Sequence, residues 1–64
     1  MTKIEFLEEL KMALASRVSA QEAIENLNFY EDYINTQVRM GRTEEEVLAE
    51  LGEARLLARN IAEN

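Results

Sequence analysis

Apolar residues recur at helical spacing in several segments of the chain. In the first segment, Phe6, Leu10 and Leu14 follow one another at intervals of four residues. The last segment has apolar residues at i, i+3, i+4 and i+7, namely Ala54, Leu57, Ala58 and Ile61. Such spacing places the apolar groups on one face of an α-helix. The whole pattern predicts four helices, over residues 3–15, 20–40, 44–51 and 54–62.

The predicted boundaries rest on capping residues and glycines. A Ser or Thr three residues before a Glu is typical of a capping box, and the chain has three such pairs: Thr2–Glu5, Ser19–Glu22 and Thr43–Glu46. Gly41 and Gly52 can adopt the left-handed conformation that ends a helix. We therefore expect the long helix to stop near Gly41 and the two short helices to be hinged at Gly52.

The helix predicted over residues 20–40 has apolar residues on two faces. One face carries Ala23, Ile24, Leu27, Tyr30, Ile34 and Val38, and the second carries Phe29, Tyr33 and Met40. A helix that is polar on only about a third of its circumference belongs at the centre of a bundle. The expected fold is an all-α, compact bundle of four helices in a single domain, residues 1–64, with this helix in the middle.

Composition and charge narrow the class of protein. The chain has 64 residues with no Cys, His or Pro, and 13 acidic against 7 basic residues give a net charge of −6. Without Cys or His it can form neither a disulfide nor a Cys/His zinc site. The acidic excess repels nucleic-acid phosphates and anionic lipid. The charged N-terminus excludes a signal peptide, and no apolar run is long enough to span a membrane, so we expect a cytoplasmic location.

Catalytic and metal sites are not expected. The run Glu44, Glu45 and Glu46 cannot converge on one ion, because successive helical residues point about 100° apart. With no His or Cys to serve as a base, the remaining nucleophiles are Ser16, Ser19 and two lysines, Lys3 and Lys11. So short a chain also has little material to enclose a substrate pocket. The sequence predicts a protein that is not an enzyme, with no cofactor, no metal and no small-molecule substrate.

The two short helices around Gly52 raise the possibility of a helix-turn-helix. Arg55 and Arg59 on the second of them could face phosphates, but the first begins with three glutamates. A recognition helix needs a basic surround. A packed helical corner is the favoured interpretation, and nucleic-acid binding is kept as an alternative.

A protein-binding surface is predicted at two apolar positions. Leu56 is turned by about 100° from the core-facing Leu57, and Met40 lies at the end of its helix. We expect both Met40 and Leu56 to be exposed and to contact a protein partner or a second copy of the chain. The aromatic group Phe29, Tyr30 and Tyr33 is expected to be mainly core.

Several segments together resemble a bacterial family. The segments "MTKIEFLEELKMAL", "NFYEDYI" and "GRTEEEVLAELGEARLLARNI" are similar to the N-terminal HAAS-type helical domain of PadR-associated membrane proteins of unknown function from Gram-positive bacteria. The resemblance covers nearly the whole chain. The positions that it carries over are structural rather than catalytic: Phe6, Leu10, Leu14, Tyr30, Tyr33, Gly41, Val47, Leu51, Gly52, Ala58 and Ile61.

The resemblance implies a cytosolic domain at the inner face of the cell membrane, with membrane contact only through segments beyond residue 64. Its implied role is signalling or regulation through protein contacts. The leading functional hypothesis is thus a non-enzymatic protein-interaction module of a membrane-linked regulator. The alternatives are a helix-turn-helix that binds nucleic acid and a free-standing small dimeric adaptor protein.

Overall fold

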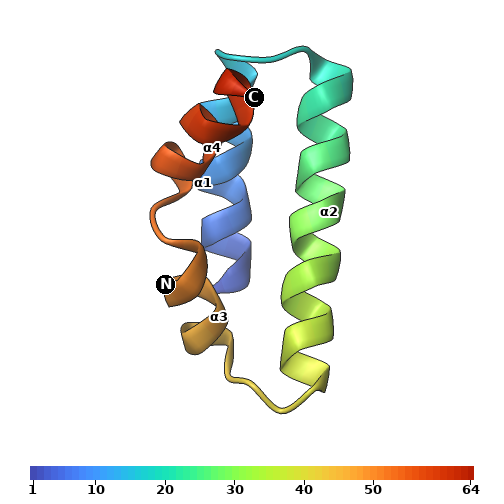
Figure 1. The fold of residues 1–64 in the computed structure, drawn as a ribbon, viewed down its shortest axis with the longest axis vertical. Helices are drawn as coiled ribbons and strands as arrows, with labels where there is room; N and C mark the ends of the chain where they lie inside the picture. Colours follow the sequence, from blue (N-terminus) through green and yellow to red (C-terminus); the bar gives the residue numbers. More distant parts are fainter.

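The computed structural model describes all 64 residues and consists of four helices without strands (Figure 1). The helices are α1 (Lys3–Ala15), α2 (Ala20–Arg39), α3 (Glu44–Leu51) and α4 (Ala54–Glu63). The predicted all-α bundle of four helices is confirmed. Two ends differ by one residue, since α2 stops before Met40 and α4 continues to Glu63.

Side-chain caps begin the first three helices. Thr2 and Thr43 each form a complete capping box, in which the hydroxyl accepts from the backbone N–H of the glutamate and the glutamate accepts from the backbone N–H of the threonine. At α2 only half of the predicted box is present. The Ser19 hydroxyl accepts from the Glu22 N–H at 3.2 Å. The Glu22 carboxylate accepts from the Ser19 hydroxyl at 3.4 Å and not from the Ser19 backbone N–H.

Glycines end α2 and α3 as the sequence predicts. Gly41 has φ +104° and donates to the Val38 carbonyl at 3.0 Å, while the next amide, of Arg42, donates to Gln37 at 3.2 Å. This pair of hydrogen bonds is the Schellman pattern of a helix C-terminus. Gly52, with φ +79°, turns the chain from α3 into α4.

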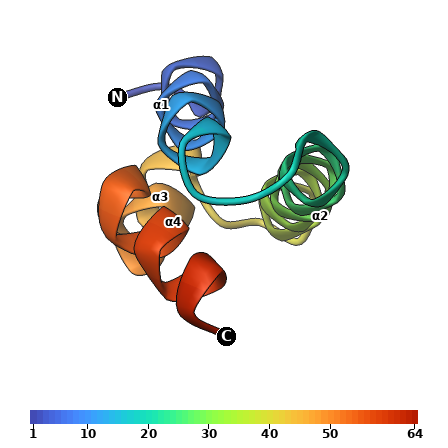
Figure 2. The same cartoon turned by 90° about the horizontal axis from the view of Figure 1, so that it is seen from above.

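The central helix is α1, not α2. α1 packs against all three other helices and makes its most extensive contact with α4. In Figure 2, α1 lies at the apex of a V whose two arms are α2 and the α3–α4 pair. The prediction of a central α2 is wrong because only Ala23 and Ile34 of that helix are buried, and apolar residues on its second face remain in contact with solvent.

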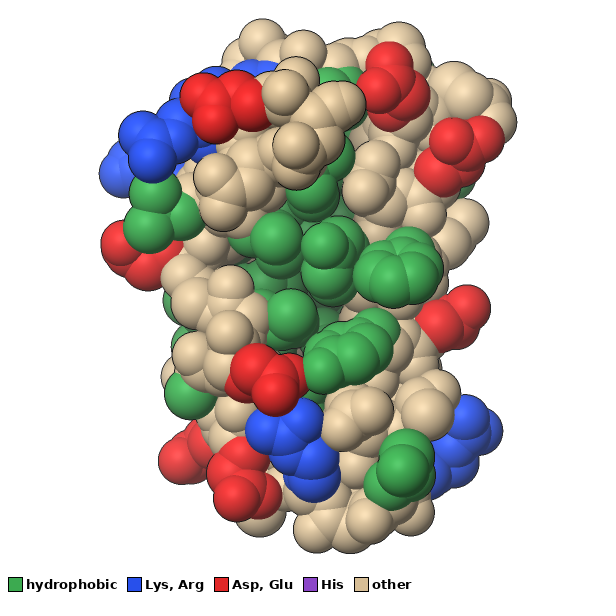
Figure 3. Space-filling view, viewed as in Figure 1, with side chains coloured by type: hydrophobic (Ala, Val, Ile, Leu, Met, Phe, Trp, Pro, Cys, Tyr) green, Lys and Arg blue, Asp and Glu red, His purple; other side chains and the backbone are tan.

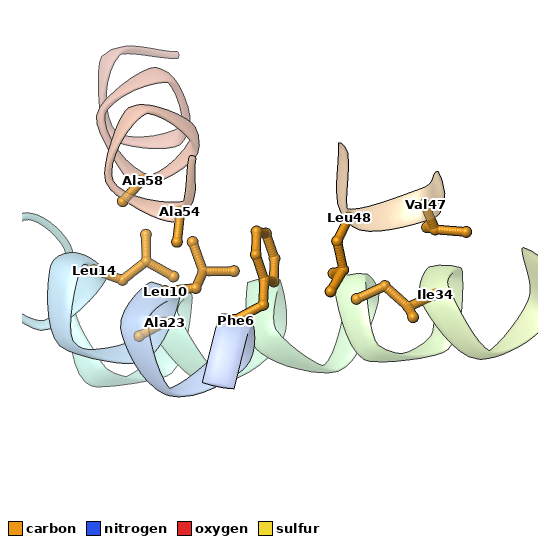
Figure 4. Close-up of a cluster of buried hydrophobic side chains, with 9 residues drawn as sticks. All are labelled: Phe6, Leu10, Leu14, Ala23, Ile34, Val47, Leu48, Ala54 and Ala58. Atoms are coloured by element: carbon orange, nitrogen blue, oxygen red, sulfur yellow. The ribbon is translucent and has the colours of Figure 1, made fainter. Parts of the chain in front are cut away.

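The core consists of nine buried apolar side chains and contains no buried polar group. They are Phe6, Leu10, Leu14, Ala23, Ile34, Val47, Leu48, Ala54 and Ala58. Figure 4 shows the two small alanines of α4 above Leu10 and Leu14, which explains how α4 can lie so close to α1. The α3 side chains lie above Ile34 in the same view, with Phe6 between the two groups.

Polar contacts at one end of the bundle join α1 to α2 and α3. The Lys3 backbone N–H donates to the Glu44 carboxylate, and the Lys3 Nζ donates to Asn35 Oδ1 at 2.8 Å. The start of α1 is thereby held against both neighbours. None of the four helices combines the length and the hydropathy needed to cross a bilayer.

Candidate interaction surface

The two residues predicted to be exposed are both exposed. Met40 caps the C-terminus of α2 and is 73% exposed, and Leu56 lies in the first turn of α4 and is 46% exposed. They belong to different helices, and no cavity is lined by both. Their part in binding a partner stays a prediction.

The aromatic group of α2 is divided between core and surface. Tyr30 and Tyr33 are half-buried and pack against the core, as predicted, but Phe29 is 60% exposed. The expectation that all three belong mainly to the core is therefore wrong for Phe29. Its ring meets the Tyr30 ring edge to face, with centroids 5.0 Å apart and an angle of 86°. This geometry holds an exposed phenyl group against a half-buried one.

An apolar surface lies between the two arms of the V. Figure 3 shows hydrophobic side chains gathered along a hollow between α2 and the α3–α4 pair. α1 forms the floor, since it packs against both arms, whereas α2 and α4 lack an extensive contact with each other. We call this surface the open face and define it by five part-buried apolar residues of the two arms together with the exposed Phe29, which lies one turn from Tyr33 on α2. The five are Tyr30, Tyr33, Leu51, Leu57 and Ile61.

A polar cluster closes one end of the open face. The Tyr33 hydroxyl donates to Glu50 Oε1 at 2.5 Å, and the Arg42 guanidinium lies 3.3 Å from Glu50 Oε2 and donates to Gln37 Oε1 at 3.0 Å. The hydrogen bond from Tyr33, followed by the one from Arg42, lowers the pKa of Glu50. The same bond to Glu50 raises the pKa of Tyr33. An exposed ion pair adds little stability, so the main effect of the cluster is to fix the Tyr33 ring against α3.

The charges close to Phe29 are negative. On a helix the neighbours of a residue are those three and four positions away, and for Phe29 these include Glu25 and Asp32. The carboxylate of Glu50 is bound to the adjacent Tyr33. The one cation of the polar cluster around Glu50 is Arg42, and it is already paired with Glu50. The open face therefore presents apolar side chains beside an acidic border along α2.

Comparison with known proteins gives the family. A model of the HAAS family matches residues 5–60, a range that includes most of every helix. This chain belongs to the HAAS family. The resemblance inferred from the sequence segments is thus confirmed. Comparisons with curated proteins and with solved structures gave no match.

The glutamate run of this HAAS domain has a structural role. The Glu46 carboxylate completes the α3 capping box, and the Glu44 carboxylate accepts from the backbone of Lys3. The hydrogen bond from the Thr43 backbone N–H is the main reason why the pKa of Glu46 is lowered. No group of three or more acidic side chains is arranged to hold a metal ion.

Two further hollows flank α1 of the HAAS domain. Between α1 and α2 a cavity of about 290 Å³ is lined mainly by apolar side chains, including Val18, Ile24 and Leu27. Where α1, α3 and α4 meet, a wider hollow of about 740 Å³ is lined by Glu9, Glu45 and Glu53 together with Arg55. Arg55, one of the two cations of the helix-turn-helix hypothesis, thus stands among carboxylates.

Sequence reasoning missed the exposure of Phe29 and the cluster around Glu50. A signal for the first was present, because Glu25 and Asp32 flank Phe29 at one helical turn on either side. The second had no local signal. Tyr33 and Glu50 are 17 residues apart, on different helices, and meet only because the Gly41 turn returns the chain alongside α2.

Proposed function

We propose that this HAAS domain is a non-enzymatic protein-interaction module, the cytosolic domain of a membrane-linked regulator. The observation that carries the proposal is Phe29, a large aromatic side chain 60% exposed on an apolar surface that the four helices leave open. Contiguous apolar surface of this kind marks interaction sites in small proteins. The family's association with PadR-like regulators supports the regulatory part of the proposal.

The open face is defined by only six side chains, which suits reversible regulation. Interfaces below about 1,200 Å² are typical of transient signalling contacts, while permanent complexes bury considerably more. Aromatic residues are enriched among the few that dominate binding energy. A partner held through Phe29 and Tyr33 could therefore be released without unfolding the domain.

The location of the native protein tests the membrane-linked part of the proposal. An antibody raised against residues 1–64 is applied to fractionated source cells, and the apparent mass and fraction of the native protein are recorded. We expect a membrane-bound band heavier than 7.4 kDa. A band of about that mass in the cytosol would overturn the membrane-linked part and favour a free-standing adaptor.

Site-specific crosslinking tests the interaction module itself. A photo-crosslinking amino acid is placed in turn at Phe29, Met40 and Leu56, with the exposed Met12 on the outer side of α1 as the control. We expect discrete heavier adducts in the source cells from positions among the first three. Adducts from none of them would refute the module. The substitutions Leu56→Ser and Met40→Ser should weaken capture of a partner bound through those residues while leaving the circular dichroism spectrum intact.

The helix-turn-helix alternative is less well supported. Arg55 lies in a hollow with three glutamates, which repel the phosphates that it would have to contact. A gel-shift titration of labelled duplex DNA at low salt separates the two functions. A shift at micromolar protein that disappears as salt is added would favour nucleic-acid binding over the interaction module.

A further inference from the structure

We propose that the open face binds one amphipathic helix of a partner protein, and that this helix carries lysine or arginine beside its apolar stripe, on the side that meets α2. The inference rests on the proposed function, because it specifies the partner that such a module would bind. Its grounds are the shape of the open face and the sign of the charges around it.

The shape of the open face fits a helix. The apolar pairs Phe29–Tyr33 on α2 and Leu57–Ile61 on α4 are each spaced i, i+4, so each arm presents a short ridge along its axis. Ridges of this spacing pack into the grooves of a neighbouring helix. α1 already lies behind both arms (Figure 2). A helix laid between the arms would close the V into a fully enclosed bundle, a common mode of peptide recognition.

The length of the arms sets the length of the partner helix. α2 has 20 residues and α4 has 10, which correspond to about 30 Å and 15 Å of helix. The stretch covered by both arms is close to the length of α4. Three turns of a partner helix, or about 11 residues, are enough to span it.

The charges select a basic partner. Within α2 the acids Glu22, Glu25, Glu31 and Asp32 outnumber a single base, Arg39. The other arm differs, because α4 carries the bases Arg55 and Arg59 and one acid, Glu63. The acidic border is therefore that of α2. Glu50 adds a further carboxylate beside Tyr33, and its only cationic partner is Arg42. Lysine or arginine beside the apolar stripe of the incoming helix would meet this border favourably and speed association.

The same charges argue against other occupants. A second copy of the chain would bring −6 against −6, with the acids of α2 on both sides of the contact. Anionic lipid and nucleic acid would be repelled for the same reason. A basic amphipathic helix is the occupant whose apolar stripe can pack on the open face while its basic side chains lie beside the acids.

Two synthetic peptides test the inference. Each has 18 residues with leucine on a helical stripe, and the flanking positions are all lysine in one peptide and all glutamate in the other. They are titrated into the ¹⁵N-labelled domain and followed by NMR. We expect the lysine peptide to shift amides of α2 and α4 around the open face, and the glutamate peptide to bind at least tenfold more weakly. Equal binding of the two, or shifts centred elsewhere, would overturn the proposal.

A matched pair of variants distinguishes binding at the open face from non-specific attraction of the lysine peptide to an acidic protein. Phe29→Ala removes an exposed side chain of the open face, and Met12→Ala removes one, 74% exposed, from the outer side of α1. We expect Phe29→Ala to weaken the lysine peptide about tenfold and Met12→Ala to leave its affinity within twofold. A reduction of similar size in both variants would refute binding at the open face.

The crosslinking experiment separates failure of the inference from failure of the proposed function. Adducts at Met40 or Leu56 but not at Phe29 would retain an interaction module and overturn the helix site. Sedimentation equilibrium adds a further check. A mass near twice 7.4 kDa that Phe29→Ala returns to the monomer value would assign the open face to a second copy, and the basic-helix proposal would be wrong.

Discussion

Truncation of Leu10 should remove most of the stability of the domain. Leu10 is fully buried on α1, the helix that packs against every other helix. Leu10→Ala removes hydrophobic transfer energy of about 0.8 kcal/mol per lost methylene and leaves a cavity, so the expected cost is about 3 kcal/mol within the range of roughly 2–5 for such changes. A domain of this size has only about 3–5 kcal/mol to lose.

The assay is thermal unfolding followed by circular dichroism at 222 nm. A loss of about 3 kcal/mol should lower Tm by roughly 12–24 °C in a domain of this length. Leu10→Met keeps the side-chain volume and should cost less than about 1.5 kcal/mol, and the exposed Met12→Ala should change stability by no more than about 0.5 kcal/mol. These two controls separate loss of core packing from a general effect of substitution in α1.

The comparison that can refute the reasoning is Leu27→Ala. Leu27 is only half-buried on α2, and the predicted cost of its truncation is about half that at Leu10. If Leu27→Ala lowers Tm more than Leu10→Ala does, α2 rather than α1 is the centre of the bundle, and the assignment of the core to α1 is wrong.

The turns and caps give three further predictions. Thr43→Ala should cost about 1 kcal/mol in urea unfolding, because the Glu46 N–H loses its acceptor at 3.1 Å; an unchanged midpoint would dismiss the cap. Gly41→Ala should cost at least about 1 kcal/mol from backbone strain at φ +104°. The added methyl group would meet no neighbouring atom, so strain alone sets this cost, and a neutral result would contradict the left-handed turn. Because the folded pKa of Glu46 is lowered, its stabilising contribution is present above the ordinary pKa of 4.5 and lost as pH falls through the lowered value. As the pH is lowered, the free energy of unfolding should therefore fall less steeply in Glu46→Gln than in the wild type. Identical curves would show that Glu46 does not contribute to the loss of stability in acid.

The helices could be predicted from the sequence because their signals are local. Thr2, Thr43 and Gly41 act on backbone groups within a few residues, so spacing along the chain is enough to locate them. The capping box at Ser19 shows the limit of such signals. Its hydroxyl caps α2, but the position of the Glu22 carboxylate depends on a side-chain rotamer that the spacing does not fix.

The arrangement of the helices was harder to predict, because burial depends on what each face meets. Phe29 and Leu10 are equally apolar in the sequence, but one is 60% exposed and the other fully buried. The small residues Ala54 and Ala58 decide the difference, since they bring α4 onto α1 rather than onto α2. Hydrophobic spacing identifies a face, and only the fit between faces determines which of them is covered.

The close pairing of α1 with α4 sets the order in which the domain can be made. The largest helix contact joins the first helix of the chain to the last. During synthesis, α1 leaves the ribosome first, with Phe6, Leu10 and Leu14 still lacking the alanines that will cover them. The loop that brings α1 and α4 together can close only after Ala54–Glu63 has emerged. The core of the domain therefore cannot be completed until α4 has left the ribosome, and a ribosome stalled before residue 54 would hold a chain with an exposed core.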